Sequence, residues 1–358
     1  MSDRKPRLCV ITTGGTIGMV RDADGIAHPP VDHSDFHNLL GPIAGRYDLT
    51  ALPLMNRDST NMLPSDWSRI AEHIDQSRGE GFDGYVVTHG TDTLAHSAAA
   101  VAFALGPPPL LSPVVFTGAM HTPDHDDYDG LANLQTACRV ASANLGEVVI
   151  AFGSSIYRGV RVEKVSATEL DAFASPESYA LGRVAEEVVL HDDAVRRGNE
   201  AEHPHWPAET GFADRVATVS LTPGLEPALY ESLLVSDRPC RGVLLRTLGA
   251  GNVSSRETTD WVRWIARATE QDIPVVLTSS FFGGRTDASG YALGQAAIEA
   301  GAIPHAGLTE PCVEVKLRHS IAAAQRHGVA ACEFVRNVMA HNYFGELGGS
   351  PQSTTEDE

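Results

Sequence analysis

Two segments decide how this chain folds: Thr12-Thr13-Gly14-Gly15-Thr16-Ile17-Gly18 (residues 12–18) and Thr88-His89-Gly90-Thr91-Asp92-Thr93 (residues 88–93). Each follows a short run of apolar, mostly β-branched residues, at 8–12 and at 85–87. Runs of this kind that end in glycine are typical of buried parallel strands. The carboxyl ends of parallel strands lie at one edge of a sheet, where open α/β sheets bind ligands. We therefore expect both turns at that edge.

Strand-like and helix-like segments alternate from residue 7 to about residue 190. Alternation of this kind predicts an α/β fold, in which a parallel sheet is covered by helices on both faces. The helix at 64 has a favourable start, because a proline occupies its first turn. The expected strands are 8–13, 47–52, 84–88, 114–117 and 147–152, and the expected helices are 64–78, 93–105 and 129–143.

The length of 358 residues suits two α/β domains better than one. A polar stretch at 191–214 has neither helical nor strand periodicity, which is typical of a linker. We predict a larger N-terminal domain at 1–190, this linker, and a smaller C-terminal α/β domain at 215–358. The strands expected after the linker are 216–221, 242–247 and 275–278, and the helices are 255–271, 293–301 and 313–326.

Composition narrows the class of partner. The formal net charge, 27 − 46 = −19, disfavours nucleic acid and anionic membrane surfaces as partners. No apolar stretch is long enough for a membrane span, and the start of the chain lacks the apolar region of a secretory signal. The five cysteines are scattered without a Cys-x-x-Cys pair, which indicates reduced thiols and a cytoplasmic location.

The first turn has two interpretations. Its paired glycines permit a sharp turn and a close approach to a ligand, and a threonine hydroxyl there can serve as a nucleophile if a base takes its proton. The same residues can also form a tight strand–helix turn with no chemistry. The spacing matches neither G-x-G-x-x-G nor a P-loop, so a nucleotide site is not expected.

The second turn places hydroxyls and a carboxylate just before an alanine-rich helix. Capping of that helix by Thr91 or Asp92 would explain either residue alone. It does not explain why a hydroxyl-rich turn occurs at two strand ends. The repetition favours covalent catalysis by an alcohol.

Together the two turns resemble the signatures of the bacterial-type L-asparaginase family, T-G-G-T-I at 13–17 and H-G-T-D-T at 89–93. The resemblance covers most of the chain, and its first strand, lack of a signal and residues 58–62 are most like the cytoplasmic type I subgroup. Further matching segments are 58–62, 116–120, Asp129-Gly130 with Asn133-Leu134, 157–159, Lys164, 171–176 and 248–252.

Residue by residue, the resemblance implies catalysis by Thr16, Thr91, Asp92 and Lys164. Thr16 would be the nucleophile, attacking the side-chain amide of L-asparagine to give a β-aspartyl ester and ammonia. Thr91, Asp92 and Lys164 would handle protons.

Substrate binding is implied at a second, overlapping set of positions. Ser59 and Thr60 match positions that hold the substrate α-carboxylate, and Asp92 matches one that pairs with its α-ammonium. Gly15 and Ala119 are implied substrate contacts as well. Without the resemblance, a turn before the helix at 64 is the preferred interpretation of Ser59 and Thr60.

The resemblance also implies assembly and cofactor use. It predicts a flavodoxin-like C-terminal domain, a homodimer or homotetramer, and neither metal nor organic cofactor, because an alcohol and water suffice for amide hydrolysis. Two alternatives stay open: a related amidase that prefers glutamine or has an amidotransferase-like role, and an asparagine-binding regulatory protein with weak turnover.

One departure from the family lies in the loop at 19–30. The family usually has an activating tyrosine there, and this chain has none; Ile26 stands near the expected place. His28 is the candidate replacement base in this loop. Two other segments are set aside: 121–130, whose acidic residues are out of register for an EF-hand and read as a solvated turn, and 281–287, a surface or interface loop.

Overall fold

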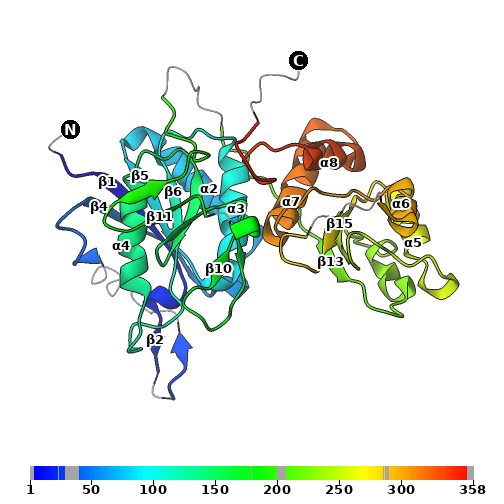
Figure 1. Ribbon diagram of the computed structural model, residues 1–358, viewed down its shortest axis with the longest axis horizontal. Helices are drawn as coiled ribbons and strands as arrows, with labels where there is room; N and C mark the ends of the chain where they lie inside the picture. The colour runs from blue at the N-terminus through cyan, green and yellow to red at the C-terminus, as the bar shows by residue number, and fades with distance from the viewer. Residues whose placement is uncertain are drawn as a thin grey trace. The chain divides into compact units, whose positions relative to one another are not determined.

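The computed structural model divides the chain into two compact units (Figure 1). It describes residues 4–22, 24–28, 40–178, 180–199, 207–284, 286 and 290–352. The first unit contains the described residues up to Thr210 together with the segment that begins at Gly348. The second unit is Gly211–Leu347.

The first unit is built on an eight-stranded sheet in the order β12-β11-β8-β7-β6-β5-β1-β4. Five neighbouring strands, β4, β1, β5, β6 and β7, run parallel. Beyond β7 the sheet continues through β8, β11 and β12, each antiparallel to the strand before it. Their bounds are β1 Arg7–Gly14, β4 Asp48–Arg57, β5 Gly84–Thr88, β6 Val114–Thr117, β7 Val148–Phe152, β8 Ser155–Arg158, β11 Gly182–Val184 and β12 Val188–Leu190.

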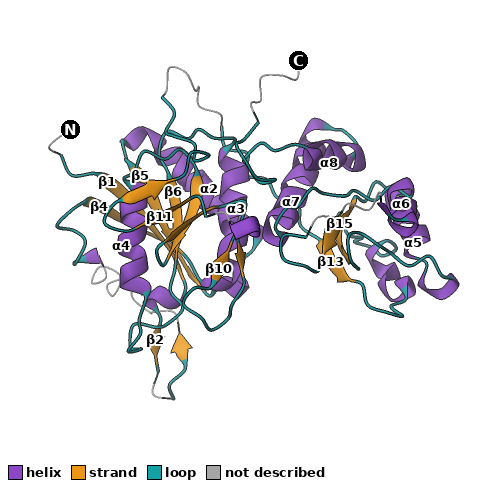
Figure 2. Cartoon of the chain, in the orientation of Figure 1, coloured by secondary structure: helices purple, strands orange, loops and turns teal. Residues whose placement is uncertain are grey.

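Helices cover both faces of this sheet, as the strand–helix alternation predicts (Figure 2). Helix α4 (Gly130–Ala141) packs on one face, where its Leu134 joins Val10 and Val86 in one core. Helix α3 (Leu94–Leu105) packs against β6 and β7 outside that core, and α2 (Pro64–Ser77) packs against α3. The predicted α/β class is confirmed.

Short elements complete the first unit. The hairpin β2–β3 follows the first turn, and the β9–β10 pair lies outside the main sheet. The bounds are β2 Val20–Arg21, β3 Ala27–His28, β9 Glu163–Lys164, β10 Phe173–Ala174, η1 Thr16–Gly18, η2 Ser59–Asn61, η3 Arg78–Glu80, η4 Thr91–Thr93 and η5 Pro176–Ser178.

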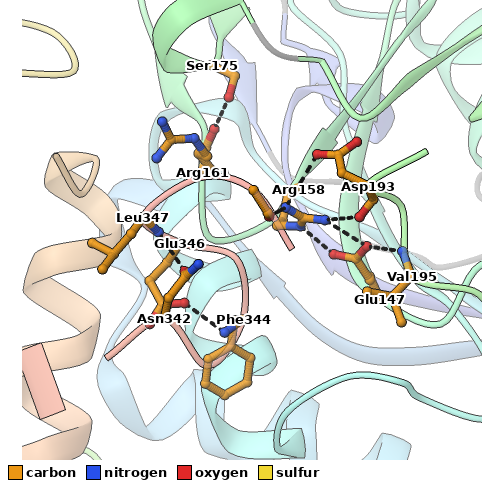
Figure 3. A network of polar contacts seen from close by, with 11 residues as sticks. Glu147, Arg158, Arg161, Ser175, Asp193, Val195, Asn342, Phe344, Glu346 and Leu347 are labelled. Carbon is orange, nitrogen blue, oxygen red and sulfur yellow. Dashed lines mark hydrogen bonds and ion pairs between the residues drawn. The ribbon is translucent and has the colours of Figure 1, made fainter. Parts of the chain in front are cut away.

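A buried ion pair joins β8 to the start of β7. Arg158 donates from Nε to Glu147 at 2.6 Å and from Nη2 at 3.1 Å, and both side chains are at most 5% exposed (Figure 3). The Val195 amide donates to the same carboxylate at 2.7 Å. Nη1 of Arg158 donates to the Gly349 carbonyl at 2.9 Å. The segment from Gly348 is thereby attached to the first unit.

The second unit has a parallel three-stranded sheet in the order β13-β14-β15. Its core gathers Trp261 and Trp264 around the sheet residues Val243 and Val275. The bounds are β13 Val216–Ser220, β14 Gly242–Thr247, β15 Val275–Ser279, α5 Trp261–Glu270, α6 Ala292–Glu299, α7 Glu310–His327, α8 Ala331–Ala340, η6 Pro227–Leu233 and η7 Glu257–Thr259.

The sequence overestimates one helix, and it omits helix α8 and several short elements. The helix expected at 255–271 begins only at Trp261, because the Asp260 side chain accepts from the Arg263 amide and caps it. The hairpin and edge strands β8 to β12 have two to four residues each, too few to show a period. None of the described helices is both long and apolar enough to cross a membrane.

Candidate active site

The two signature turns touch through their backbones. Strands β1 and β5 pair in register, with Thr12 opposite Thr88, so the turns leave the sheet side by side. Gly15 has a φ of 88°, and a Cβ built on it would lie 2.4 Å from the Gly90 nitrogen. Thr13 Oγ1 donates to the Thr88 carbonyl at 2.8 Å. Only glycine at position 15 permits this close approach.

A cavity of about 180 Å³ opens beside these turns. That volume is well below the roughly 300–1,000 Å³ of sites that bind drug-sized molecules, so it suits a ligand the size of an amino acid. The cavity is lined by Gly15, Thr16, Met19, Asp58, Ser59, Gly90, Thr91, Asp92, Met120, Lys164 and Ala167.

Lys164 links the second turn to the β9–β10 pair. Its Nζ donates to Thr91 Oγ1 at 2.9 Å and to Asp92 Oδ1 at 2.7 Å. The Thr91 residue is buried, whereas the Asp92 side chain is 57% exposed. A hydroxyl hydrogen-bonded to an amine at this distance is arranged for proton transfer. The three residues predicted as a proton-handling set are therefore together.

Ser59 and Thr60, predicted together, are placed differently. Ser59 lines the cavity, and its carbonyl accepts from Thr93 Oγ1 at 2.8 Å. The Thr60 hydroxyl donates to Asp58 Oδ1 at 2.8 Å, and Thr60 does not line the cavity. The Thr60 amide donates to the same Asp58 oxygen at 2.9 Å, which caps η2. The turn that the sequence offered as an alternative is present at Thr60.

Ala119 is fully buried and lies next to the cavity rather than on its wall, and Met120 takes the lining position. The Asp129 carboxylate accepts from the Met120 amide at 3.0 Å and from the His121 amide at 3.1 Å. Asn133 Nδ2 donates to Asp129 at 2.9 Å. The start of α4 thus fixes the segment that follows β6.

His89 of the second signature supports the turn from behind the cavity. The Gly90 carbonyl, 2.7 Å from Nδ1, can only accept, so Nδ1 carries the proton and Nε2 accepts from Ser97 Oγ at 2.9 Å. Burial lowers the pKa of His89 to about 4. The imidazole is therefore neutral at physiological pH, and it does not line the cavity.

The loop after the first turn is only partly described, because residue 23 and residues 29–39 lie outside the described residues. His28 Nε2 contacts Asp22 Oδ2 at 2.8 Å, and neither His28 nor the exposed Ile26 is among the lining residues. Arg21 pairs with Asp124 at 3.0 Å. The candidate replacement base is thus engaged by an acid in its own hairpin.

The acidic 121–130 segment is a turn, and 281–287 is described only in part. The rings of His121 and His125 stack with centroids 4.0 Å apart. Nowhere in the described parts of the chain do three His, Cys, Asp or Glu side chains form a group suited to a metal ion. Phe281 and Phe282 are exposed; residues 285 and 287 lie outside the described residues.

Five lining residues were not predicted as site residues. Asp58, Gly90 and Met120 lie within motifs that the resemblance already marks, so their neighbours in the sequence were an available signal. Met19 directly follows the first turn segment, residues 12–18. Ala167 carries no sequence signal, because it reaches the cavity only through the position of the loop after β9.

Known protein families match both units of the chain. The family models described as "Asparaginase, N-terminal" and "Glutaminase/Asparaginase C-terminal domain" match residues 7–196 and 215–329. L-asparaginase 1 of Escherichia coli is 32% identical over 357 residues, which cover 96% of this chain and 98% of the relative.

Two further similarities bear on activity and fold. One subunit of the glutamyl-tRNA(Gln) amidotransferase of Aeropyrum pernix is also 32% identical, over 95% of this chain and 79% of that protein. The solved structure of the thermostable L-asparaginase from Thermococcus kodakarensis superposes with a TM-score of 0.83 at 29% identity. That superposition covers 96% of this chain and all of the other.

Proposed function

The chain belongs to the asparaginase family of amidohydrolases, and on that premise we propose that it hydrolyses L-asparagine to L-aspartate and ammonia. The single observation that carries the proposal is the Thr91–Lys164–Asp92 set, which faces the same small cavity as Thr16. The cavity therefore contains the Thr16 hydroxyl and a second hydroxyl, that of Thr91, which is hydrogen-bonded to the Lys164 nitrogen.

The charges around the cavity suit a zwitterion. Asp58 and Asp92 supply carboxylate oxygens, Lys164 supplies N–H donors, and Ser59 supplies a hydroxyl donor. An amino acid brings one ammonium and one carboxylate, and burying both requires partners for each. We assign the ammonium to Asp92 and the carboxylate to Ser59. An amide without these two groups leaves the partners unpaired and should bind poorly.

In the proposed reaction the Thr16 hydroxyl adds to the side-chain amide carbon of asparagine. Its proton passes through the Thr91–Lys164 pair to the departing nitrogen, so that ammonia leaves and a β-aspartyl ester remains on Thr16. Water then adds to the ester carbonyl, and the Thr16 oxygen recovers a proton as aspartate departs. Backbone N–H groups at the two turns are the candidate donors to the oxyanion, each typically worth about 3 kcal/mol.

The test measures ammonia release from L-asparagine by the full chain and by Thr16→Ala and Thr91→Val variants. We expect both variants to lose nearly all turnover. Mass spectrometry of acid-quenched enzyme should find the aspartyl ester on the peptide that contains Thr16. An ester on the Thr91 peptide would reverse the two roles, and wild-type protein no faster than Thr16→Ala would refute the activity.

A second candidate is an amidase that uses glutamine, favoured by the similarity to the amidotransferase. The comparison of kcat/KM for asparagine and glutamine decides between the two. A protein that binds asparagine without releasing ammonia would instead be the regulatory alternative. We propose further that the chain assembles as a homodimer or homotetramer, which light scattering at several concentrations measures.

A further inference from the structure

A tyrosine outside the signatures holds the turn that carries Thr16. The Tyr128 hydroxyl donates to the Ile17 carbonyl at 2.8 Å, across 111 residues of sequence. Ile17 lies in η1, a single 3-10 turn whose backbone bonds run from Gly18 to Gly15 and from Met19 to Thr16. Because this turn has so few bonds of its own, one added tether is a large share of what fixes it.

The position of the Tyr128 ring depends on the absence of a side chain at Gly130. A Cβ on Gly130 would lie 2.3 Å from the Tyr128 hydroxyl oxygen, so the ring occupies the space that a side chain at 130 would take. Burial, together with the Asp129 carboxylate, raises the pKa of Tyr128. The hydroxyl therefore stays protonated and remains a donor; it does not serve as a base for Thr16.

A second tyrosine holds the strand beside Lys164. The buried Tyr157 hydroxyl donates to the Phe173 carbonyl at 2.9 Å. Phe173 on β10 is the register partner of Lys164 on β9, and each of these strands has only two residues. As at the first turn, the tether acts on a short element with few bonds of its own.

We propose that Tyr128 and Tyr157 are positioning residues, one for the turn of Thr16 and one for the strand of Lys164. The proposal rests on the proposed function, in which Thr16 attacks and Lys164 moves the proton. Both hydroxyls act on main-chain carbonyls next to the reacting groups and neither tyrosine lines the cavity. Their contribution is to geometry, on which attack and proton transfer depend steeply.

The kinetic test replaces each tyrosine with phenylalanine and compares a matched control. Tyr85→Phe is that control, since Tyr85 is buried and its hydroxyl contacts Ser77 at 3.3 Å near the opposite, amino end of β5. We expect Tyr128→Phe and Tyr157→Phe to lower kcat about tenfold, the equivalent of one hydrogen bond, with KM for asparagine changed less than about twofold. Tyr85→Phe should keep kcat and show a similar change in Tm.

Gly130→Ala tests the same tether without altering the tyrosine. The added methyl displaces the Tyr128 ring, whereas alanine is a good helix former at the start of α4. We expect kcat to fall as in Tyr128→Phe with little change in Tm, and the double variant to be no slower than either single one. Full activity in Gly130→Ala, or equal kcat values for Tyr128→Phe and Tyr85→Phe, would overturn the role of Tyr128.

Hydrogen exchange separates this proposal from the proposed function, because it needs no substrate. Tyr128→Phe should speed exchange in the peptide spanning 16–20, and Tyr157→Phe in the peptide spanning 163–174, each without affecting the other. Unchanged exchange in both variants overturns the tethers even if asparagine is hydrolysed. If the tethers are present but wild-type protein releases no ammonia, the proposed function fails instead.

Discussion

The two units contain the same chemical pair in two different environments. Lys164 meets Asp92 at 2.7 Å in the first unit, and Lys316 meets Glu346 at 2.7 Å in the second. The side chains of the first pair are 17% and 57% exposed, whereas both side chains of the second are 0% exposed. The two pairs therefore have the same length and differ in burial.

Burial decides which role each pair can have. The ammonium of Lys316 also donates to the His341 carbonyl at 2.7 Å. Glu346 accepts from the Phe344 amide at 2.7 Å (Figure 3). A pair closed in this way has no face left for a ligand and serves the fold. Lys164 instead lines the cavity, and in the proposed function its hydrogen bonds to Thr91 and Asp92 are exchanged for bonds to the substrate.

The largest effect is expected on activity from Lys164→Met. In the proposed reaction Lys164 moves a proton in the transition state, and such a residue contributes about 10²–10⁴-fold, so we expect kcat to fall roughly 10³-fold. The free energy of unfolding should change by less than about 1 kcal/mol, because the pair is partly solvated. Ammonia release and urea denaturation measure the two quantities. If Lys164→Met lowers the free energy of unfolding but leaves kcat per folded molecule unchanged, Lys164 has a structural role like that of Lys316.

The same substitution at the buried pair should act on stability. Lys316→Met leaves the Glu346 carboxylate buried without its cation, which typically costs about 3–5 kcal/mol. Hydrogen exchange in α7 reports the second unit directly. The double substitution Lys316→Met with Glu346→Leu should recover much of the loss. A Lys316→Met protein with wild-type exchange in α7 would contradict the assignment.

Acid should destabilise both units through one buried histidine each. Burial lowers the pKa of His89 and of His305 to about 4, so in the folded state both stay neutral below their ordinary 6.5. The unfolded chain then binds more protons than the folded one, and stability falls as pH drops from about 6.5 to 4, by up to about 3 kcal/mol each.

Asparagine variants check this acid dependence. His89→Asn keeps a donor to the Gly90 carbonyl, and His305→Asn keeps an acceptor for the Gly307 and Leu308 amides. Neither asparagine titrates, so each variant should lose stability less steeply between pH 6.5 and 4 than wild type in unfolding experiments. Identical slopes for wild type and variant would show that the histidine in question does not contribute.

The smallest effect distinguishes two glycines with positive φ that follow the strands β1 and β14. Gly15 has a φ of 88° and backbone within 2.4 Å of its missing Cβ, whereas Gly249 has a φ of 57° and only Asn252 Nδ2 at 3.7 Å. Gly249→Ala should cost about 1 kcal/mol of stability from strain alone. Gly15→Ala should cost about 2–3 kcal/mol and also lower kcat. Equal costs in thermal unfolding would refute the close contact of the two turns.

The fold class could be predicted because, in the first unit, the alternation of strand-like and helix-like segments and the turn residues between them are clear in the sequence. The parallel strands and α2 to α4 lie within a few residues of their predicted bounds. The segment that carries Lys164 was marked by resemblance alone, since β9 has two residues and no period. What fixes Lys164 is its pairing with Phe173, a contact that depends on the tertiary fold.

Part of the candidate site was predictable from the turns that follow two predicted strands. Thr16 and Thr91 stand in those turns and line the cavity, whereas Ser59, which also lines it, was implied by the resemblance alone. Thr60 shares its motif with Ser59, but the Asp58 carboxylate accepts its hydroxyl. The Thr60 rotamer decides whether the hydroxyl bonds to Asp58 or points to a ligand. The spacing of residues in the sequence does not predict that rotamer. Ala167 could not be predicted as a site residue, because only the tertiary fold brings it to the cavity.

The bond from Arg158 to Gly349 has a consequence in time. The two residues are 191 positions apart, whereas Arg158 and Glu147 are 11 apart. At about 5–20 residues per second, the ribosome delivers Gly349 roughly 10–40 s after Arg158. The nascent first unit can form its buried ion pair early, but it must wait for the whole second unit to be synthesised before that arginine gains its last partner.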